Sequence, residues 1–304
     1  MDCIAVIDKP TGMTSHDVVA RVRRLAGQRR VGHAGTLDPA ATGVLLVLLG
    51  QATRVAEYLS DSGKEYRAVV RFGIETTTYD AEGKVVHEAP VTLTREQIES
   101  VMPAFLGVIQ QRPPVYSAIK RGGVPLYALA RAGKAVEAPL RMVRIDALNI
   151  ISWEAPDLTI DVNCGKGAYI RSLAHDLGAI LGPGAHLASL VRTRSGPFTL
   201  AQAISLEQFA DSLSTGAWRD MLFAADEALL DWRAAILGAE TARMFRDGRE
   251  LRFGKAYGVP VEADELARVY STSGAFLGIM RWSDTGQCWL PSKSLATTLE
   301  TDDE

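Results

Sequence analysis

Residues 32–43 read Gly-His-Ala-Gly-Thr-Leu-Asp-Pro-Ala-Ala-Thr-Gly and run directly into the apolar stretch Val44–Leu49. Asp38 lies in the middle of this loop of small residues, and Pro39 follows it. Charged side chains rarely lie so close to a core segment unless they have a partner or a chemical role. An aspartate before proline is most often a turn former or a helix cap. Residues elsewhere in the chain must therefore decide between a structural and a chemical role for Asp38.

The composition is typical of a soluble globular protein that can bury a sizeable core. The chain has 304 residues, of which 47% are hydrophobic and 23% charged, enough for one large domain or two ordinary ones. Its net charge of -3 hides an asymmetry, because basic residues outnumber acidic ones in residues 1–200 and the reverse holds afterwards. A mildly basic first part is compatible with a polyanionic partner but does not by itself establish RNA binding.

The cysteines and the apolar runs argue against several classes of protein. Cys3, Cys164 and Cys288 lie far apart without a Cys-x-x-Cys pair, which argues against a zinc site or a disulfide framework and fits a reducing compartment. The longest apolar run, Val44–Leu49, is far too short to span a membrane, and no secretory signal is visible. We therefore expect a cytoplasmic protein with no metal site and no membrane segment.

Hydrophobic periodicity and capping signals predict a mixture of strands and helices. Thr14–Asp17 and Thr94–Gln97 match capping boxes, each of which opens a helix. The other predicted elements are a strand near Val6, a helix over Ala52–Leu59, strands over Tyr66–Phe72 and Lys84–His87, an antiparallel pair over Met142–Trp153 and Leu158–Cys164, and a helix over Tyr169–Leu181. Because strands and helices do not alternate regularly, we expect an α+β fold.

The pattern changes after about residue 235, where short β-like runs separated by Gly and Asp turns follow. We predict a first domain over residues 1–235 and a small β-rich domain over residues 236–299, with a helical connector over Leu206–Leu237. The chain ends in an acidic tail over residues 300–304, which we expect to fray.

Six spaced motifs resemble those of the TruB family of tRNA pseudouridine synthases, in the family's order and over roughly residues 4–200. They are Asp8-Lys9-Pro10-x-Gly12-x-Thr14-Ser15, Gly32-His33-x-Gly35-x-Leu37-Asp38-Pro39-x-Ala41-x-Gly43-Val44-Leu45, Lys64-x-Tyr66, Pro114-x-x-Ser117-Ala118, Gly165-Lys166-Gly167-x-Tyr169-Ile170-Arg171-x-Leu173 and Gly184-Ala185-His186-x-x-x-Leu190. The resemblance implies the pseudouridine synthase fold, a mixed, mainly antiparallel central sheet flanked by helices. The C-terminal residues resemble the RNA-binding PUA type only loosely.

The resemblance implies that the chain isomerises the T-loop uridine of tRNA (position 55) to pseudouridine. This reaction breaks the C1′–N1 bond and rejoins the base through C5, so it needs no metal and no organic cofactor. By resemblance, Asp38 is the nucleophile, and Arg171 pairs with it to keep it ionised and aimed. On its own, Arg171 would more often be a surface or structural arginine.

A uridine stacked inside an RNA loop must be flipped out before its glycosidic bond can be reached. By resemblance, His33 takes the vacated stacking position, and Tyr66 stacks on the flipped base and can help to move a proton. Tyr169 and Leu190 resemble residues that line the uracil pocket, and Lys9 resembles one that supports the active-site turn or a phosphate. Without the flanking motifs, these side chains would be interpreted as loop or core residues.

The expected partner is the T-arm stem-loop of tRNA, with no obligate protein partner and a monomeric state implied by the resemblance. Residues 110–137 resemble an insertion with which the family grips the RNA stem-loop. Five arginines can contact phosphates or form a solvated face: Arg21, Arg23, Arg24, Arg29 and Arg30. After Leu190 the family usually has two arginines before a threonine, whereas here Val191-Arg192-Thr193 follows, so one contact of the family is in doubt.

Three alternatives stay open from the sequence. A protein of the same fold can bind and fold tRNA without chemistry, and a guide-RNA-dependent relative needs a small RNA and protein partners. An unrelated hydrolase that uses Asp38 would lack a second acid-base pair or a metal set nearby. The carboxylate of Asp38 beside a uracil pocket favours the enzyme over the pure binder, and the insertion favours a synthase that acts alone.

Overall fold

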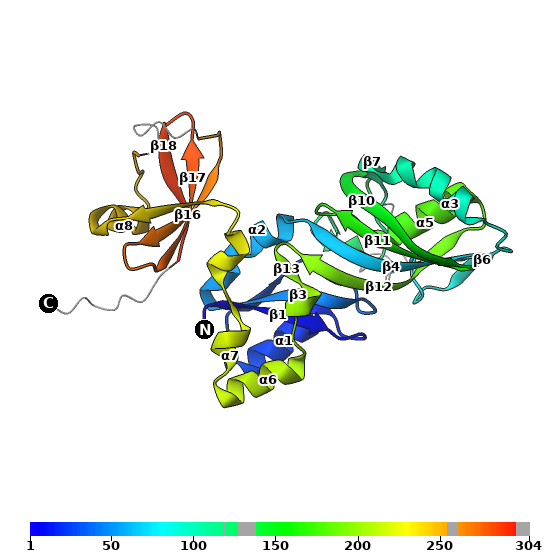
Figure 1. Cartoon of the computed structure of the whole chain (residues 1–304), viewed down its shortest axis with the longest axis horizontal. Coiled ribbons are helices and arrows are strands. Elements are labelled where there is room, and N and C mark those ends of the chain that lie inside the picture. Colours follow the sequence, from blue (N-terminus) through cyan, green and yellow to red (C-terminus); the bar gives the residue numbers. More distant parts are fainter. Residues whose placement is uncertain (118, 127–137, 254–260, 296–304) are drawn as a thin grey trace.

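The computed structural model describes residues 1–117, 119–126, 138–253 and 261–295. A ten-stranded sheet crosses the larger part of the molecule, and a four-stranded sheet forms a smaller unit at the C-terminal end (Figure 1). Along the large sheet the strands run β14 (Phe223–Ala224), β1 (Cys3–Lys9), β3 (Thr42–Leu49), β12 (Ala185–Ser195), β4 (Lys64–Phe72), β11 (Asp157–Cys164), β10 (Arg141–Glu154) and β7 (Gly107–Gln111), with β2 (Val31–Ala34) on β3 and β13 (Phe198–Thr199) on β12. The predicted α+β class with a mainly antiparallel sheet is confirmed.

The helices beside the large sheet contribute to a single apolar core on one of its faces. Helices α1 (Ser15–Leu25), α3 (Arg95–Val101), α5 (Ile170–Leu181) and α6 (Leu206–Thr215) supply buried Val18, Ile98, Leu173 and Phe209 to it. The predicted capping boxes are present, since Thr14 and Thr94 each accept from the backbone three residues on. α3 ends at Val101, and the short helical turn Met102–Phe105 follows it.

The opposite face of β1 and β3 is also buried, which explains the apolar run after the Asp38 loop. Leu45 and Val47 face the helix side, whereas Val44, Leu46 and Leu48 pack against the other side. That second core includes Ala52, Val55 and Leu59 from the turn Gly50–Val55 and helix α2 (Ala56–Asp61), a segment that we predicted to be one helix. A strand covered on both faces reads as continuously hydrophobic.

The two halves of the large sheet meet where β3 and β12 run parallel. This short contact pairs Thr42 with Val191 and Gly43 with Arg192, whereas the other ladders of the large sheet are antiparallel. Gly43 has a φ of 94°, and a Cβ built on it would lie 2.3 Å from the carbonyl oxygen of Arg192. The junction therefore requires glycine at this position.

Gly43→Ala is expected to lower the free energy of unfolding by about 3 kcal/mol, because it adds a backbone clash to an unfavourable positive φ. Gly216→Ala is the matched control, since Gly216 has a φ of 81° but nothing within 4 Å of its Cβ position. Denaturant unfolding should separate the two variants. Equal losses of unfolding free energy in both variants would show that the close approach of β3 to β12 does not destabilise Gly43→Ala.

The C-terminal sheet has the order β15 (Arg233–Leu237), β16 (Leu266–Ser271), β17 (Phe276–Ser283) and β18 (Cys288–Ser294), with helix α8 (Ala239–Arg246) packed on it. Our prediction of a helical connector over Leu206–Leu237 is therefore wrong in its last part. After α6 and α7 (Trp218–Met221) the chain forms the short strand β14 and then β15, which pairs in parallel with β16. Pairing with a distant strand overrides the local pattern here. Because β15 crosses residue 235, the predicted division of the chain there stays a proposal.

The C-terminal sheet rests on α2 (Figure 1). Lys293 of β18 forms an ion pair with Glu57 at 2.8 Å, and the rings of Tyr58 and Trp232 meet edge to face at 5.0 Å. On the other side of the molecule, β5 (Ile74–Thr76) pairs with β6 (Val85–Glu88), and β8 (Lys120–Arg121) with β9 (Val124–Pro125). Most of the second half of the predicted insertion and the acidic tail lie outside the described residues.

Candidate active site

Five of the predicted site residues come together around one cavity of about 260 Å³. Asp38 reaches it from the loop before β3, Tyr66 from β4, Tyr169 and Arg171 from the start of α5, and Leu190 from β12. The cavity lies beside the parallel junction of β3 and β12, and its lining also includes Lys64 and Arg192. Segments far apart in the sequence thus meet at the point where the two halves of the sheet join.

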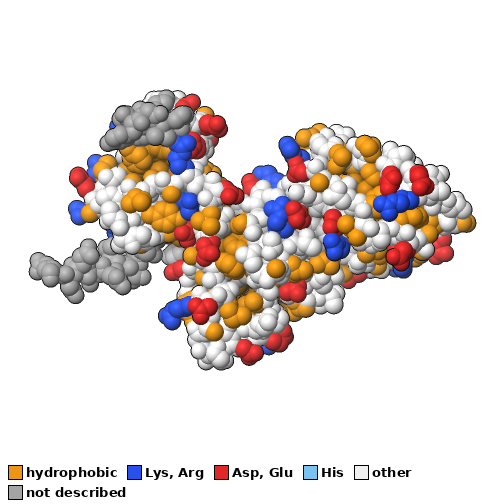
Figure 2. All heavy atoms as spheres, in the orientation of Figure 1, with side chains coloured by type: hydrophobic (Ala, Val, Ile, Leu, Met, Phe, Trp, Pro, Cys, Tyr) orange, Lys and Arg blue, Asp and Glu red, His pale blue; other side chains and the backbone are white. Residues whose placement is uncertain are grey.

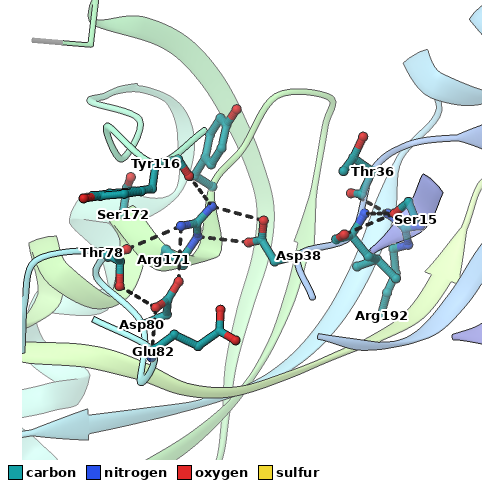
Figure 3. Close-up of polar contacts among 12 residues, drawn as sticks. Ser15, Thr36, Asp38, Thr78, Asp80, Glu82, Tyr116, Arg171, Ser172 and Arg192 are labelled. Atoms are coloured by element: carbon teal, nitrogen blue, oxygen red, sulfur yellow. Dashed lines mark hydrogen bonds and ion pairs between the residues drawn. The ribbon is translucent and has the colours of Figure 1, made fainter. Parts of the chain in front are cut away.

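Asp38 and Arg171 form a two-pronged ion pair in this cavity (Figure 3). The Nε atom of Arg171 lies 2.9 Å from one carboxylate oxygen of Asp38, and Nη2 donates to the other at 3.1 Å. The Arg171 side chain is only 6% exposed, whereas that of Asp38 is 42% exposed. The guanidinium therefore fixes the carboxylate in direction while leaving it open to a ligand.

Arg171 also holds a second carboxylate that the sequence did not indicate. Its Nη1 atom lies 3.2 Å from Asp80 and donates to the carbonyl of Thr78, and its Nη2 donates to the carbonyl of Tyr116 (Figure 3). Asp80 lies in the polar loop between β5 and β6, where its sequence neighbours give no sign of contact with α5. Only the three-dimensional structure brings it to the site.

Burial raises the pKa of Asp38, and the neighbouring Asp80 raises it further, while the Arg171 guanidinium and Lys9 lower it. The net direction is upward, so desolvation outweighs the pairing that we expected to keep this carboxylate ionised. A carboxylate whose pKa is raised is a stronger base than a fully solvated one. The pair with Arg171 limits how far the pKa rises.

The loop that carries Asp38 is held by buried cations bonded to its carbonyl oxygens. The Lys9 Nζ atom is fully buried and donates to the carbonyls of Pro10, Met13 and Pro39 at 2.6–3.0 Å. The hydroxyl of Ser15 adds to this support, because it donates to the carbonyl of Leu37 and accepts from the N–H of the same residue. Of the two roles that we predicted for Lys9, the geometry fits support of the turn, because all three N–H donors of its ammonium have protein partners.

Arg192, the single arginine left by the departure from the family pattern, is also fully buried in this framework. Its Nε donates to the carbonyl of Val44 at 2.7 Å, and its Nη2 donates to that of Gly35 at 2.9 Å. These bonds fix both ends of the Asp38 loop. The sequence indicated Arg192 only as the neighbour of a missing arginine, and its support of the Asp38 loop follows from the structure alone.

Tyr66, which is buried on β4, and Tyr169, which is half-buried at the start of α5, both line the cavity. Burial raises the pKa of both Tyr66 and Tyr169, so each keeps its phenolic proton at neutral pH. The side chain of Gln111 clamps the backbone of Tyr169, since it donates to the Tyr169 carbonyl at 3.0 Å and accepts from its N–H at 2.8 Å. The end of β7 is thereby tied to the start of α5.

His33 does not line this cavity, in contrast to the other predicted aromatic residues. It lies on β2, and its ring meets that of His16 edge to face at 5.3 Å. Burial lowers the pKa of His33, and its neighbours His16 and Arg192 lower it further, so the ring is neutral at neutral pH. His16 lines a second cavity of about 680 Å³ that shares Asp38 and Arg171 with the first.

Within the described part of the chain, no group of His, Cys, Asp and Glu side chains is arranged to hold a metal ion. No helix there is long and apolar enough to cross a membrane.

The five predicted arginines near α1 are all exposed. Two of them have protein partners, because Arg23 donates to Val31 and Arg30 donates to Thr53 and Gln51. Figure 2 shows basic and acidic side chains interspersed on the face that it presents.

Comparison with known proteins identifies the family. The sequence profile described as "TruB family pseudouridylate synthase (N terminal domain)" matches residues 23–170, and that of the "tRNA pseudouridylate synthase B C-terminal domain" matches residues 171–237. The chain belongs to the TruB family of pseudouridylate synthases. It is 44% identical over 289 residues to the "tRNA pseudouridine synthase B" of Pseudomonas aeruginosa, covering 93% of each chain. A relative of the same name from Geobacter sulfurreducens is 41% identical over 301 residues.

Solved structures show the same fold as this TruB chain. The crystal structure of a Cbf5-Nop10-Gar1 complex matches with a TM-score of 0.74 and 26% identity, covering 97% of this chain and 84% of the other. An H/ACA ribonucleoprotein bound to a substrate RNA matches with a TM-score of 0.73 at 23% identity, which supports the fold alone. Membership of the TruB family makes the chain a pseudouridine synthase, an isomerase, and so confirms the enzyme that the sequence motifs predicted.

Proposed function

We propose that this TruB-family enzyme isomerises the T-loop uridine of tRNA to pseudouridine and that Asp38 is its nucleophile. The observation that carries the proposal is the carboxylate of Asp38, held by Arg171 through an ion pair and a hydrogen bond and open to a cavity lined by Tyr66, Tyr169 and Leu190. Relatives at 41–44% identity are named as tRNA enzymes, which supports tRNA as the substrate. The residue roles rest on the geometry and on the family motifs.

The target base must leave its stack before it can enter this cavity, at a cost of a few kcal/mol. The second cavity, lined by His16, Pro39 and Tyr116, also borders Asp38, and the ring of His33 meets that of His16 edge to face. A neutral His33 ring can occupy the place that the base vacates without the cost of burying a charge. Inside the first cavity, Tyr66 and Leu190 can hold the two faces of the uracil.

The chemical step begins with attack of an Asp38 oxygen on C1′ of the ribose, which breaks the C1′–N1 bond. The freed base turns in the cavity, C5 bonds to C1′, and the Asp38 carboxylate leaves. The C5 proton is then removed and N1 takes up a proton, so the product is an isomer of the substrate. Arg171 keeps the carboxylate aimed in both displacements, and no oxidant or cofactor is consumed.

A synthase that acts alone is favoured over a guide-dependent one by the overall match. The match to the tRNA enzyme of Pseudomonas aeruginosa covers 93% of that enzyme at 44% identity. The match to the protein in the Cbf5 complex covers 84% of that protein at 26% identity. We therefore include in the proposal a monomer that needs no protein partner and acts on the T-arm in the cytoplasm. The remaining alternative, a tRNA-binding protein without chemistry, has no need for the Asp38–Arg171 pair.

The proposal is tested with purified protein and a T-arm stem-loop that carries tritium at C5 of its uridines. Release of tritium without added protein or guide RNA is the expected result. A stem-loop in which the target uridine is replaced by cytidine is the control. Tritium release that depends on a guide RNA would contradict an enzyme that acts alone. Release from another uridine would contradict the T-loop uridine as the target.

A further inference from the structure

The wall of the catalytic cavity carries two buried cations in addition to Arg171. A Cβ built on Gly35 would lie 3.3 Å from Cε of Lys64 and 3.4 Å from Nη1 of Arg192, so these two side chains meet at one stretch of the wall. Lys64 is 6% exposed and Arg192 is fully buried. In Figure 3, Arg192 lies apart from the Asp38–Arg171 pair, on the far side of Asp38.

Neutral carbonyl groups hold both cations. The Lys64 Nζ atom donates to the carbonyls of Ser60 and Ser62 at 2.8 and 2.6 Å, and Arg192 donates to those of Val44 and Gly35. An ammonium group has three N–H donors, so among the described residues two of those of Lys64 are taken. Lys64 also lines the cavity, so its third donor is the one that could serve a ligand there.

The acidic residues next to Lys64 in the sequence are paired elsewhere. Asp61 forms an ion pair with Lys166 at 2.6 Å, and Glu65 forms one with Arg194 at 2.8 Å. The charged residues in the lining of the cavity are thus Asp38 against Arg171, Lys64 and Arg192. Asp80 offsets part of this charge through its ion pair with Arg171, but three cations still face two carboxylates. A neutral uracil ring gains little from this excess of positive charge, whereas an anion would be stabilised by it.

The proposed reaction creates such an anion. When Asp38 bonds to C1′, its carboxylate becomes a neutral ester, and the electron pair of the C1′–N1 bond leaves on the uracil ring. The negative charge therefore passes from Asp38 to the base inside the same cavity. It returns to Asp38 when C5 bonds to C1′ and the ester is broken.

We propose that Lys64, supported by Arg192, stabilises the negative charge on the uracil while it is detached from the ribose. Lys64 thereby acts as an additional catalytic residue of the cavity, one that binds the base anion more strongly than the neutral base. This inference rests on the proposed function, because it assigns a group to the same reaction.

The protonation state of Lys64 gives the inference a pH signature. Burial lowers the pKa of Lys64 to about 8, and Arg192 and Lys166 act in the same direction, while Cys164 and Asp61 oppose it. The ammonium form is the one that stabilises an anion, so kcat/KM should fall as the pH rises through about 8. An arginine at this position would stay charged across that range.

The first experiment compares wild type, Lys64→Met and Lys64→Arg on the T-arm stem-loop across pH. We expect Lys64→Met to lower kcat by about 10²-fold with little change in KM, the magnitude seen when one donor to a developing anion is removed. We also expect it to lose the alkaline fall of kcat/KM. Lys84→Met, which removes an exposed lysine, is the control and should behave as wild type. An alkaline fall that persists unchanged in Lys64→Met would overturn the inference.

A second experiment changes the leaving group. In RNA with 5-fluorouridine at the target, fluorine stabilises the detached base anion, so cleavage of C1′–N1 should depend less on Lys64. Single-turnover loss of 5-fluorouridine, followed by mass spectrometry of nucleoside digests, should show a penalty for Lys64→Met at least about tenfold smaller than with uridine. Equal penalties on both substrates would refute anion stabilisation.

The activity of the wild-type enzyme tests the proposed function, and the behaviour of Lys64→Met tests the role of Lys64. A wild-type enzyme that converts no T-loop uridine would overturn the proposed function itself. A wild-type enzyme that is active, with Lys64→Met failing both tests, would overturn only the role of Lys64. If Lys64→Met does not fold by circular dichroism, Lys64→Arg decides, since an alkaline fall that moves above the wild-type pH supports the inference and one that does not move refutes it.

Discussion

Asp38→Asn is expected to reduce the rate of conversion of the T-loop uridine by at least about 10⁴-fold, because removal of a catalytic nucleophile causes rate losses of that size. Asparagine has the same shape, so it can keep the contacts of the loop, including the bond from the Ala41 N–H to the Asp38 carbonyl at 3.1 Å. It lacks the negative charge that Arg171 holds and that the attack on C1′ requires. Tritium release from the labelled stem-loop under single-turnover conditions measures the loss.

RNA binding should survive this substitution, because the cavity, the tyrosines and the basic surface are unchanged. Asp161→Asn is the matched control, since Asp161 pairs with the exposed Arg67 on the sheet surface and should leave the rate within about twofold of wild type. The contrast between lost turnover and retained binding also decides between the enzyme and a tRNA-folding protein of the same fold. An Asp38→Asn variant that converts uridine as fast as wild type would remove Asp38 from the mechanism.

Much of the site could be predicted from the sequence, because its residues lie in short motifs whose local structure is strongly specified. Asp38 follows a tight turn at Gly35, Tyr66 lies in an alternating strand, and Arg171 opens a helix after a glycine loop. These segments match the TruB motifs in the family's order, and that resemblance, rather than their local structure, predicted that they would meet at one site. The structure brings Tyr169 and Leu190 to the same cavity as expected.

The rest of the site depends on contacts between segments that no local pattern reveals. Asp80 reaches Arg171 only because the loop between β5 and β6 folds back onto β12, where it bridges Leu187. Lys9 and Arg192 bond to backbone carbonyls, and any residue type can supply those. The same reason explains the error at β15, whose strand form follows from its pairing with β16 and not from its own sequence.

Arg171→Met is expected to damage both stability and catalysis, because it leaves Asp38 and Asp80 without their shared cation. Removing one partner of a buried ionic network costs about 3 kcal/mol, and the lower end of the usual range applies since Asp38 is 42% exposed. Arg171 lowers the pKa of Asp38 against the effects of burial and Asp80, so its loss should raise that pKa further. The ionised form is the active one, and kcat/KM should therefore fall at a higher pH as the solution is acidified.

Denaturant unfolding and a pH-rate profile of the Arg171→Met variant test the two effects separately. Arg67→Met is the control, because Arg67 is 53% exposed in its pair with Asp161 and its loss should cost less than about 1 kcal/mol. The double variant with Asp80→Asn should recover part of the stability, since one of the two unpaired carboxylates is gone, but none of the activity lost with the guanidinium that aims Asp38. An acid limb that stays at its wild-type pH in Arg171→Met would mean that Arg171 does not hold the Asp38 carboxylate in its ionised form.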